Sequence, residues 1–287
     1  MHVSVPIYTE TEITQINGLK LPLGSHAIRR SNSLSMATAP PGMKPTPDGT
    51  FKKAGEFLPE YVLEMQNGAK AIVRTYGGNC FSYVTSEGVQ VMGVRKDAAD
   101  IKSDSKPYAG GAPHCFPQFG PGAIMQHGFA RGMKFVPEER AKKLSFDRMI
   151  FKLIPTPETL AIWPYNFEYR FDITLRDDCL EWDLIIHNFD DKPFDVTLGM
   201  HNYFDVSSLK NVVISGPFKG KPTVDKVSGA AGTAPSDDIV ITQHIDMLYQ
   251  GVTGPVTITD SGKKTRTTIV SYCLLYYILS FSLYIYF

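Results

Sequence analysis

The sequence predicts an all-β protein, built as a large antiparallel sandwich or barrel. From about residue 60 onward, short runs of β-branched and aromatic residues alternate with turn signals, as in AIVRTYGG, FSYVTSEG, VQVMGV and VVISGP. Such runs are typical of successive strands in an all-β domain. The chain has 287 residues, of which 43% are hydrophobic and 20% charged, so it can bury the core of one large globular domain.

The strongest strand pattern lies in FEYRFDITL, residues 167–175. Apolar residues occupy every second position there, namely Phe167, Tyr169, Phe171, Ile173 and Leu175. A period of two indicates a half-buried strand. LEWDLIIHN, residues 180–188, repeats the alternation after Asp177 and Asp178, so the two strands are predicted to form a hairpin. From this hairpin to Gly216 no strong apolar run has helical spacing, so we expect helices to be minor elements.

The chain divides into three predicted parts. Residues 1–55 are expected to be a disordered N-terminal extension, and residues 56–266 form the β-sandwich domain. Residues 267–287 are a tail without any charge, which would be long enough as a helix to span a bilayer. Because 10 of its 21 residues are Ser, Thr or Tyr, a strand suits it as well. A membrane anchor, a terminal strand and sequence not native to the domain all stay open.

The charge balance argues against nucleic acid as a partner. Lys plus Arg and Asp plus Glu both number 29, so the chain carries no global basic field. A small neutral or locally bound anionic ligand fits this composition better. We expect no membrane partner apart from the alternative that the tail leaves open, and a monomer.

The cysteines and the N-terminus bear on the compartment. The cysteines lie too far apart to form a Cys-x-x-Cys pair and are predicted to be buried reduced thiols: Cys80, Cys115, Cys179 and Cys273. No apolar signal region follows Met1, which favours a reducing compartment, and we predict a cytoplasmic protein. Residues 13–46 hold four basic residues, several serines and no acidic residue, so a plastid transit segment is the alternative.

A stiff loop is predicted in GGAPHCFPQFGPGAIMQHGFAR, residues 110–131. Its prolines fix φ, while its glycines allow the positive φ of tight turns. Such a loop can hold polar side chains against a ligand, or it can be purely structural. A second stretch, GMHNYFDVS, places His201 beside Asn202 at the end of an apolar strand. A lone histidine in that position is more often a core residue than a functional one.

Taken together, five ordered segments resemble the glucose-6-phosphate 1-epimerases, also called hexose-6-phosphate mutarotases, and among them the plant apospory-associated protein C type. The segments are GGAPHCFPQFGPG, MQHGFAR, WPYNFEYRFDITL, VTLGMHNYFDVS and ITQHIDMLY. The resemblance covers roughly residues 60–266. It implies a galactose-mutarotase-like fold, an antiparallel β-sandwich that holds a sugar on its concave face. It also implies an isomerase that interconverts the α and β anomers of a hexose 6-phosphate without a metal or nucleotide cofactor.

The resemblance assigns roles to individual residues. Anomer exchange needs one group to remove the proton of the anomeric hydroxyl and another to protonate the ring oxygen. By similarity, His201 is the catalytic general acid at the ring oxygen. Gln126 and Arg131 are similar to substrate-binding residues, and Arg131 offers a planar fork to phosphate or hydroxyl oxygens. His127 is a further hydrogen-bond partner, and Asp246 matches the acidic residue that holds sugar hydroxyls.

The sequence departs from the family pattern in two places. Many members carry an arginine directly before the Gly-Gly, where this chain has Ala109, so recognition of a 6-phosphate is in question; Lys106 is the alternative cation. The general base of the family is a glutamate in a C-terminal strand and loop, but no Asp or Glu follows Asp260 here. We therefore expect the C-terminal strands of the sandwich to be missing or replaced and turnover to be weak. A carbohydrate-binding or regulatory protein without turnover is the alternative, and a tail-anchored protein with a β-sandwich head is a third hypothesis.

Overall fold

The computed structural model describes residues 59–93, 110–243 and 245–270, together with the backbone of strands at 3–13, 44–45, 51–52 and 279–284. The predicted all-β antiparallel fold is confirmed, because every strand pair in this part of the chain is antiparallel. Helical structure in the described residues is limited to α1 (Pro157–Ile162) and the 3-10 turns η2 (Ala130–Gly132) and η3 (Leu209–Asn211). Helices are thus minor elements, as the sequence predicts.

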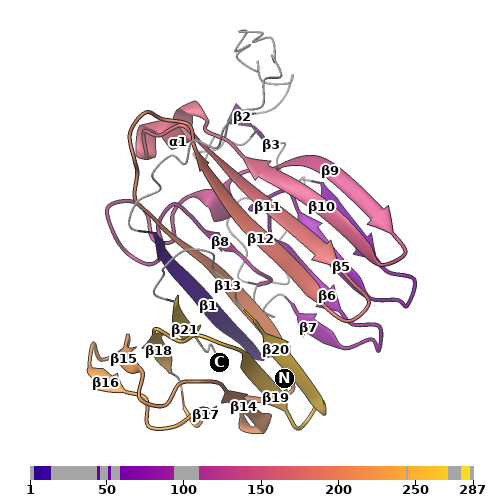
Figure 1. Cartoon of the computed structure of the whole chain (residues 1–287), viewed down its shortest axis with the longest axis vertical. Helices are drawn as coiled ribbons and strands as arrows, with labels where there is room; N and C mark the ends of the chain where they lie inside the picture. The colour runs from indigo at the N-terminus through magenta and orange to yellow at the C-terminus, as the bar shows by residue number, and fades with distance from the viewer. Residues whose placement is uncertain are drawn as a thin grey trace, which may run out of the picture.

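The largest sheet has eleven strands and runs the length of the molecule (Figure 1). In spatial order its members are β16 (Ala231–Thr233), β15 (Pro222–Asp225), β18 (Asp246–Gln250), β21 (Leu279–Tyr284), β1 (Val3–Ile13), β13 (Val196–Val206), β7 (Gln90–Met92), β6 (Cys80–Val84), β5 (Lys70–Arg74) and β4 (Glu60–Glu64), with β8 (His114–Cys115) paired to β13 beside this path.

Two four-stranded sheets and one short ribbon complete the described strands. One four-stranded sheet has the order β12 (Leu180–Asn188), β11 (Phe167–Leu175), β10 (Phe146–Leu153) and β9 (Val136–Lys143). The other has the order β17 (Asp238–Val240), β14 (Val212–Ser215), β19 (Val256–Asp260) and β20 (Thr265–Ile269). The ribbon pairs β2 (Lys44–Pro45) with β3 (Phe51–Lys52).

The hairpin predicted from its period of two is confirmed. β11 and β12 pair in continuous register from Phe167↔Asn188 to Leu175↔Leu180, around the turn at Asp177 and Asp178. The odd-numbered residues of β11 are all buried. One polar position differs from a simple alternation, since Asp172 is only 7% exposed. The guanidinium of Arg170 donates two hydrogen bonds of 2.5 Å to this carboxylate, which shields it from solvent.

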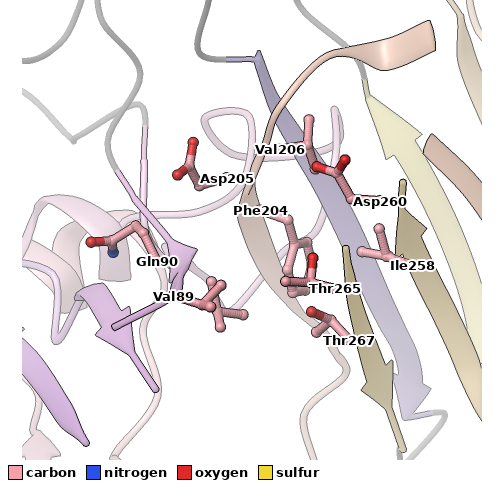
Figure 2. Close-up of a pocket in the computed structure, with 10 residues that line it drawn as sticks. Val89, Gln90, Phe204, Asp205, Val206, Ile258, Asp260, Thr265 and Thr267 are labelled. Atoms are coloured by element: carbon pink, nitrogen blue, oxygen red, sulfur yellow. The ribbon is translucent and has the colours of Figure 1, made fainter. Parts of the chain in front are cut away.

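The β19–β20 hairpin joins the end of β13 beside a small pocket, shown in Figure 2. The pocket is lined by residues of β13, β19 and β20 and by the start of β7, among them Gln90, Asp205 and Asp260. Next to it, the ammonium of Lys263 donates to the Gln90 carbonyl at 3.0 Å, the Asp205 carbonyl at 2.8 Å and the Asp205 carboxylate at 2.8 Å. A single side chain thereby links the hairpin turn to β7 and β13.

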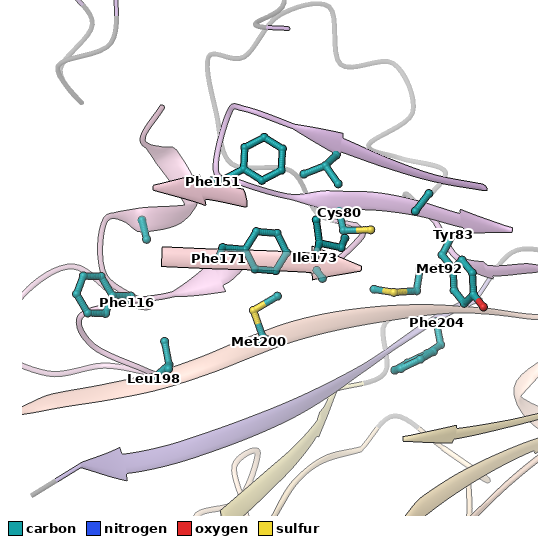
Figure 3. Close-up of a cluster of buried hydrophobic side chains, with 14 of the residues drawn as sticks. Cys80, Tyr83, Met92, Phe116, Phe151, Phe171, Ile173, Leu198, Met200 and Phe204 are labelled. Carbon is teal, nitrogen blue, oxygen red and sulfur yellow. The ribbon is translucent and has the colours of Figure 1, made fainter. Parts of the chain in front are cut away.

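The hydrophobic core lies between the β9–β12 sheet and the part of the large sheet formed by β4–β7 and β13. Figure 3 shows Phe151 and Phe171 in the centre of this layer, facing Met200 of β13. The two sheets meet directly, because the rings of Tyr61 on β4 and Phe151 on β10 make an edge contact with centroids 5.6 Å apart. Phe151 and Phe171 are fully buried, and burying such a side chain stabilises a fold by roughly 1.5–3 kcal/mol.

Strands also occur within the predicted N-terminal extension and tail. β1, at residues 3–13, pairs with β13 over eleven positions, and β21 lies between β1 and β18. The ribbon of β2 and β3 lies in the predicted extension, and β20 crosses the predicted boundary at residue 266. The division at residues 55 and 266 stays a prediction, and the remaining residues of both segments, apart from Val270, lie outside the described part. None of the described helices is long and apolar enough to cross a membrane.

β13 presents two different faces to its surroundings, and this arrangement positions the site. Met200 points into the core (Figure 3), while His201 and Tyr203, at odd-numbered positions of the same strand, lie on the opposite face. The segment from Gly111 to Cys115 runs antiparallel beside β13, with the Tyr203 amide bonded to the Gly111 carbonyl. The motif predicted to carry the catalytic histidine is therefore held in the middle of a continuous sheet.

Candidate active site

His201 lies in the middle of β13, on the face away from the core. Its backbone amide donates to the Pro113 carbonyl at 2.9 Å, which fixes the strand at this point. The imidazole stacks on the Tyr203 ring with centroids 4.7 Å apart and an interplanar angle of 14°. It is only 6% exposed, and this burial lowers its pKa to about 3. His201 is therefore neutral at pH 7 in the ligand-free chain.

His127 comes from the predicted stiff loop and lies against His201. The two imidazole rings make an edge contact with centroids 5.6 Å apart and an interplanar angle of 86°. His127 has a φ of 65°, a left-handed conformation that is uncommon for a residue other than glycine. Burial and, to a smaller extent, the nearby charge of Arg131 together lower its pKa to about 4. The structure thus brings two of the predicted site residues together.

The loop that carries His127 is closed by hydrogen bonds within itself. The amide of Gly120 donates to His127 Nδ1 at 3.1 Å, and the amide of His127 donates to the Gly120 carbonyl at 3.0 Å. The Phe119 amide donates to Thr197 Oγ1 at 2.7 Å, which joins the loop to the start of β13. Gly128 follows His127 with a φ of 64°, and a Cβ there would lie 2.1 Å from the Phe116 carbonyl oxygen. These contacts agree with the predicted stiffness of residues 110–131.

Arg131 and Gln126 lie at the end of the same loop. Arg131 belongs to η2, and its guanidinium donates to the Gln126 carbonyl at 2.7 Å. Among the described residues no carboxylate pairs with Arg131, so its positive charge is not neutralised there. The side chain of Gln126 is exposed, and the structure fixes its backbone rather than its amide. A guanidinium that pairs with no described carboxylate and lies near the neutral His127 favours an anionic ligand.

Asp246 lies on the same sheet face as His201 but farther away. Met247 of β18 is level with Leu283, which is level with Ile7, which is level with Asn202 of β13. Paired residues share a face, and so Asp246, the neighbour of Met247, lies on the face of His201 and Tyr203. Three strand spacings separate β18 from β13, about 14 Å at roughly 4.8 Å per strand. Asp246 could therefore contact only the far side of a sugar bound at His201.

Several residues of the site region were not predicted. Tyr203 is two positions after His201 in the quoted HNYF segment, so strand periodicity could have placed it on the same face. Gln118 and Gly120 belong to the predicted loop, but their contacts with residues 124–127 have no sequence signal. Ala109 and Lys106 lie outside the described residues. The pocket of Figure 2 contains none of the predicted site residues, and we do not assign the site to it.

His114, in contrast, lies on the core face of the same region. It pairs with Met200, and its ring is fully buried among Phe135, Tyr169 and Phe171. Nε2 lies 3.1 Å from the Gly78 carbonyl and Nδ1 lies 2.7 Å from the Tyr169 hydroxyl, so both nitrogens are used in the core. Burial lowers the pKa of His114 to about 4. Its role is structural.

The lowered pKa of His114 predicts a measurable pH dependence of stability. In the unfolded chain this histidine takes up a proton near its ordinary pKa of about 6.5, whereas in the folded chain it does so only near 4. Its contribution is fully present above pH 6.5 and is lost as the pH falls towards 4. His114→Gln should reduce the slope of unfolding free energy against pH by about 1.2 kcal/mol per unit between pH 6 and 5.

Urea unfolding at a series of pH values measures this slope. His187→Gln, which replaces an exposed histidine, provides the matched control. Because the slope reports protons bound, it is separable from any general loss of stability in His114→Gln. An unchanged slope in His114→Gln would contradict the assignment of His114 as a buried neutral core residue.

The sequence also identifies the family of this chain. The sequence profile of the family described as aldose 1-epimerase matches residues 59–272, which is most of the chain. The chain belongs to the aldose 1-epimerase family. Its membership makes it an isomerase-type protein of the sugar epimerase and mutarotase class, and the resemblance stated from the sequence is confirmed.

Relatives and solved structures agree with this family. A protein of Cenchrus ciliaris provisionally named glucose-6-phosphate 1-epimerase is 30% identical over 240 residues, covering 79% of this chain and 71% of that protein. One of the same provisional name from Escherichia coli is 32% identical over 144 residues, covering 49% and 47%. A structure from Salmonella typhimurium, provisionally named a mutarotase, has a TM-score of 0.68 at 20% identity and covers 79% of this chain and 82% of its own. A galactose mutarotase-like protein from Clostridium acetobutylicum has a TM-score of 0.61 at 15% identity, covering 79% and 88%. These structures confirm the galactose-mutarotase-like fold of this family member.

Proposed function

We propose that this chain is a glucose-6-phosphate 1-epimerase, which interconverts the α and β anomers of a hexose 6-phosphate. The observation that supports this most directly is the contact between the neutral rings of His201 and His127, with the positive charge of Arg131 close to His127. The relative from Cenchrus ciliaris is provisionally named for the same activity. In the reaction the O1–H proton leaves and the C1–O5 bond opens as O5 gains a proton. The free aldehyde then turns and recloses, so no atom is lost.

His201 has the role of the acid at the ring oxygen. Its pKa of about 3 means that the neutral imidazole, rather than the imidazolium, faces the sugar at pH 7. A neutral imidazole can donate a hydrogen bond that polarises a substrate oxygen. A histidine with a lowered pKa has this role in triosephosphate isomerase. The Tyr203 ring holds the imidazole plane, and the Pro113 carbonyl holds the backbone. Little reorganisation is then needed when the ring opens.

The other four predicted residues bind the substrate in this proposal. Arg131 attracts the phosphate, and Gln126 and His127 donate hydrogen bonds to sugar oxygens from the loop. Asp246, about 14 Å from β13 by the strand spacing, accepts from hydroxyls on the far side of the sugar. The proposal needs no metal or nucleotide cofactor.

The general base is the missing part of the proposed machinery. No acidic residue follows Asp260. Asp205 shares the face of β13 with His201 and Tyr203, and its carboxylate accepts a hydrogen bond from the Lys263 ammonium at 2.8 Å. A positioned base contributes about 10²- to 10⁴-fold to a rate. We therefore propose that the turnover of this chain is weak.

Arg131→Met tests whether the guanidinium reads a phosphate. Nuclear magnetic resonance exchange spectroscopy gives the rate of α–β exchange for glucose 6-phosphate and for glucose at several concentrations. The KM for glucose 6-phosphate should rise about 10- to 100-fold, because a charge-assisted hydrogen bond contributes roughly 1.5–3 kcal/mol, while the KM for glucose changes little.

Arg176→Met is the control for this measurement. Arg176 is a partly exposed arginine at the β11–β12 turn, where it pairs with Glu181, and its loss should change neither KM. An equal rise in the KM for both sugars in Arg131→Met would mean that Arg131 does not recognise the phosphate.

A second function, binding of a hexose without turnover, is favoured by one observation. The sequence after Asp260 offers no carboxylate for the base, while His127 contacts His201 and Arg131 lies at the end of the same loop as His127. Titration calorimetry with glucose 6-phosphate separates the two functions. Binding without any anomer exchange above the spontaneous rate supports the binding protein, and exchange above it supports the epimerase.

A further inference from the structure

We propose that Gln118 is a positioning residue that acts through the Gly120 peptide to fix which ring nitrogen of His127 carries the proton. The effect of Gln118 on the reaction rate rests on the proposed function. Its effect on the His127 tautomer does not, because it is inferred from the hydrogen bonds within residues 118–127.

The carboxamide of Gln118 holds the two sides of this loop together. Nε2 lies 3.1 Å from the Gly120 carbonyl and 3.2 Å from the Ile124 carbonyl, and Oε1 accepts from the Ile124 amide at 3.2 Å. The head group fills the loop interior closely, since a Cβ at Gly122 would lie 2.3 Å from Oε1. An amide is needed in this position, because it must donate on one side and accept on the other.

The Gly120 peptide transmits this anchoring to His127. Its carbonyl accepts hydrogen bonds from the Gln118 side-chain amide and from the His127 backbone N–H. Its own N–H donates a hydrogen bond to His127 Nδ1. A backbone N–H can only donate, so Nδ1 must be the unprotonated nitrogen. With the pKa lowered to about 4, the ring is neutral and its single proton is on Nε2.

This arrangement decides what His127 can do beside His201. Nδ1 is used by the loop, so His127 can offer the sugar a donor at Nε2 but not an acceptor. Its backbone is held at a φ of 65°, which the reciprocal bonds with Gly120 stabilise. If Gln118 no longer holds Gly120, the N–H of Gly120 can turn away. The ring can then carry its proton on either nitrogen, and its direction is no longer fixed.

The test measures the tautomer of His127 in the full chain with nitrogen-15 labelled histidines, at pH 7. The signals of His127 are assigned by their loss in His127→Gln. In the unaltered chain we expect Nδ1 to show the shift of an acceptor nitrogen and Nε2 that of a protonated one. A protonated Nδ1 in the unaltered chain overturns the inference without any variant.

Gln118→Glu is the main variant, because it keeps the size of the side chain and replaces the two donated hydrogen bonds by repulsion from carbonyl oxygens. We expect the two His127 shifts to move towards each other, and the exchange rate for glucose 6-phosphate to fall about 10-fold or more. If Gln118→Glu does not fold, Gln118→Met serves, since it removes the same bonds without adding charge. A folded variant with the original His127 shifts overturns the inference.

Gln90→Glu is the matched control. The Gln90 carboxamide also bridges strand residues, at 3.0 Å to Ser82 Oγ and 3.3 Å to the Tyr83 carbonyl, but away from the loop. Its loss should leave the His127 shifts unchanged. A tautomer change in Gln118→Glu in a chain that never exchanges anomers would support the positioning role and contradict the proposed function, so the two can fail separately.

Discussion

Replacing His201 by Gln should lower the rate of anomer exchange of glucose 6-phosphate by about 10²- to 10⁴-fold, the usual contribution of a positioned acid. Glutamine keeps an N–H group but cannot give up that proton to O5 as imidazole does, so the ring-opening step loses its proton transfer. The midpoint of thermal unfolding should change less than the rate, because the His201 ring lies on the face of β13 opposite Met200, where it contacts the rings of Tyr203 and His127. Exchange spectroscopy and calorimetry measure the two quantities on the same preparation.

His114→Gln is the control that gives the opposite pattern. His114 pairs with Met200, the neighbour of His201 in β13, but its ring is buried on the core face between Gly78 and Tyr169. Its replacement should lower the unfolding midpoint while the rate per folded molecule stays close to that of the unaltered chain. An unchanged rate in His201→Gln, or equal losses of rate in the two variants, would contradict the assignment of His201 as the acid.

The pH profile tests the charge state of His201 independently. With a pKa of about 3, the imidazole is neutral across pH 6–8. If the neutral form acts, kcat/KM should vary by less than about threefold over this range, because this parameter reports the free protein. If the imidazolium were required, kcat/KM would rise about tenfold for each unit that the pH falls.

The fold follows from local pattern to a large extent. The alternation over residues 167–175 and its repeat over 180–188 are enough to give the hairpin, its turn and its buried face. Asp172 shows where pattern alone is insufficient: it occupies a polar position, yet the neighbouring Arg170 covers it. The order of the eleven strands depends on contacts between segments far apart in the chain, such as β1 with β13, which periodicity does not contain.

For the candidate site, the sequence predicts the residues but not their arrangement. His201 and its face can be obtained from the strand period, and the resemblance to the family singles out Gln126, His127, Arg131 and Asp246. What the sequence could not provide is their mutual geometry. The contact of His127 with His201 joins residues 74 positions apart and depends on a left-handed backbone at a non-glycine residue. The lowered pKa of each ring is a consequence of burial, which only the packed structure defines.

If the chain lacks a general base, as we propose, supplying one should raise its activity. Residues after Val270 can be exchanged for the glutamate-bearing C-terminal segment of the glucose-6-phosphate 1-epimerase family. This junction preserves β20, whose residues pair with β19 from Val256↔Ile269 to Asp260↔Thr265. The exchange rate for glucose 6-phosphate should rise about 10²- to 10⁴-fold, which corresponds to roughly 3–5 kcal/mol of activation free energy.

The matched control for this exchange is the same segment with its glutamate changed to glutamine. It supplies the same strands and the same packing, so a rise that requires the glutamate assigns the effect to the base and not to improved folding. A rise in both would mean that packing of the large sheet, in which β21 now lies between β18 and β1, limits the reaction. If the unaltered chain already matches the glutamate-bearing one, the base lies within the present residues. Asp246 and Asp205, which both lie on the face of His201, would then be the first carboxylates to replace.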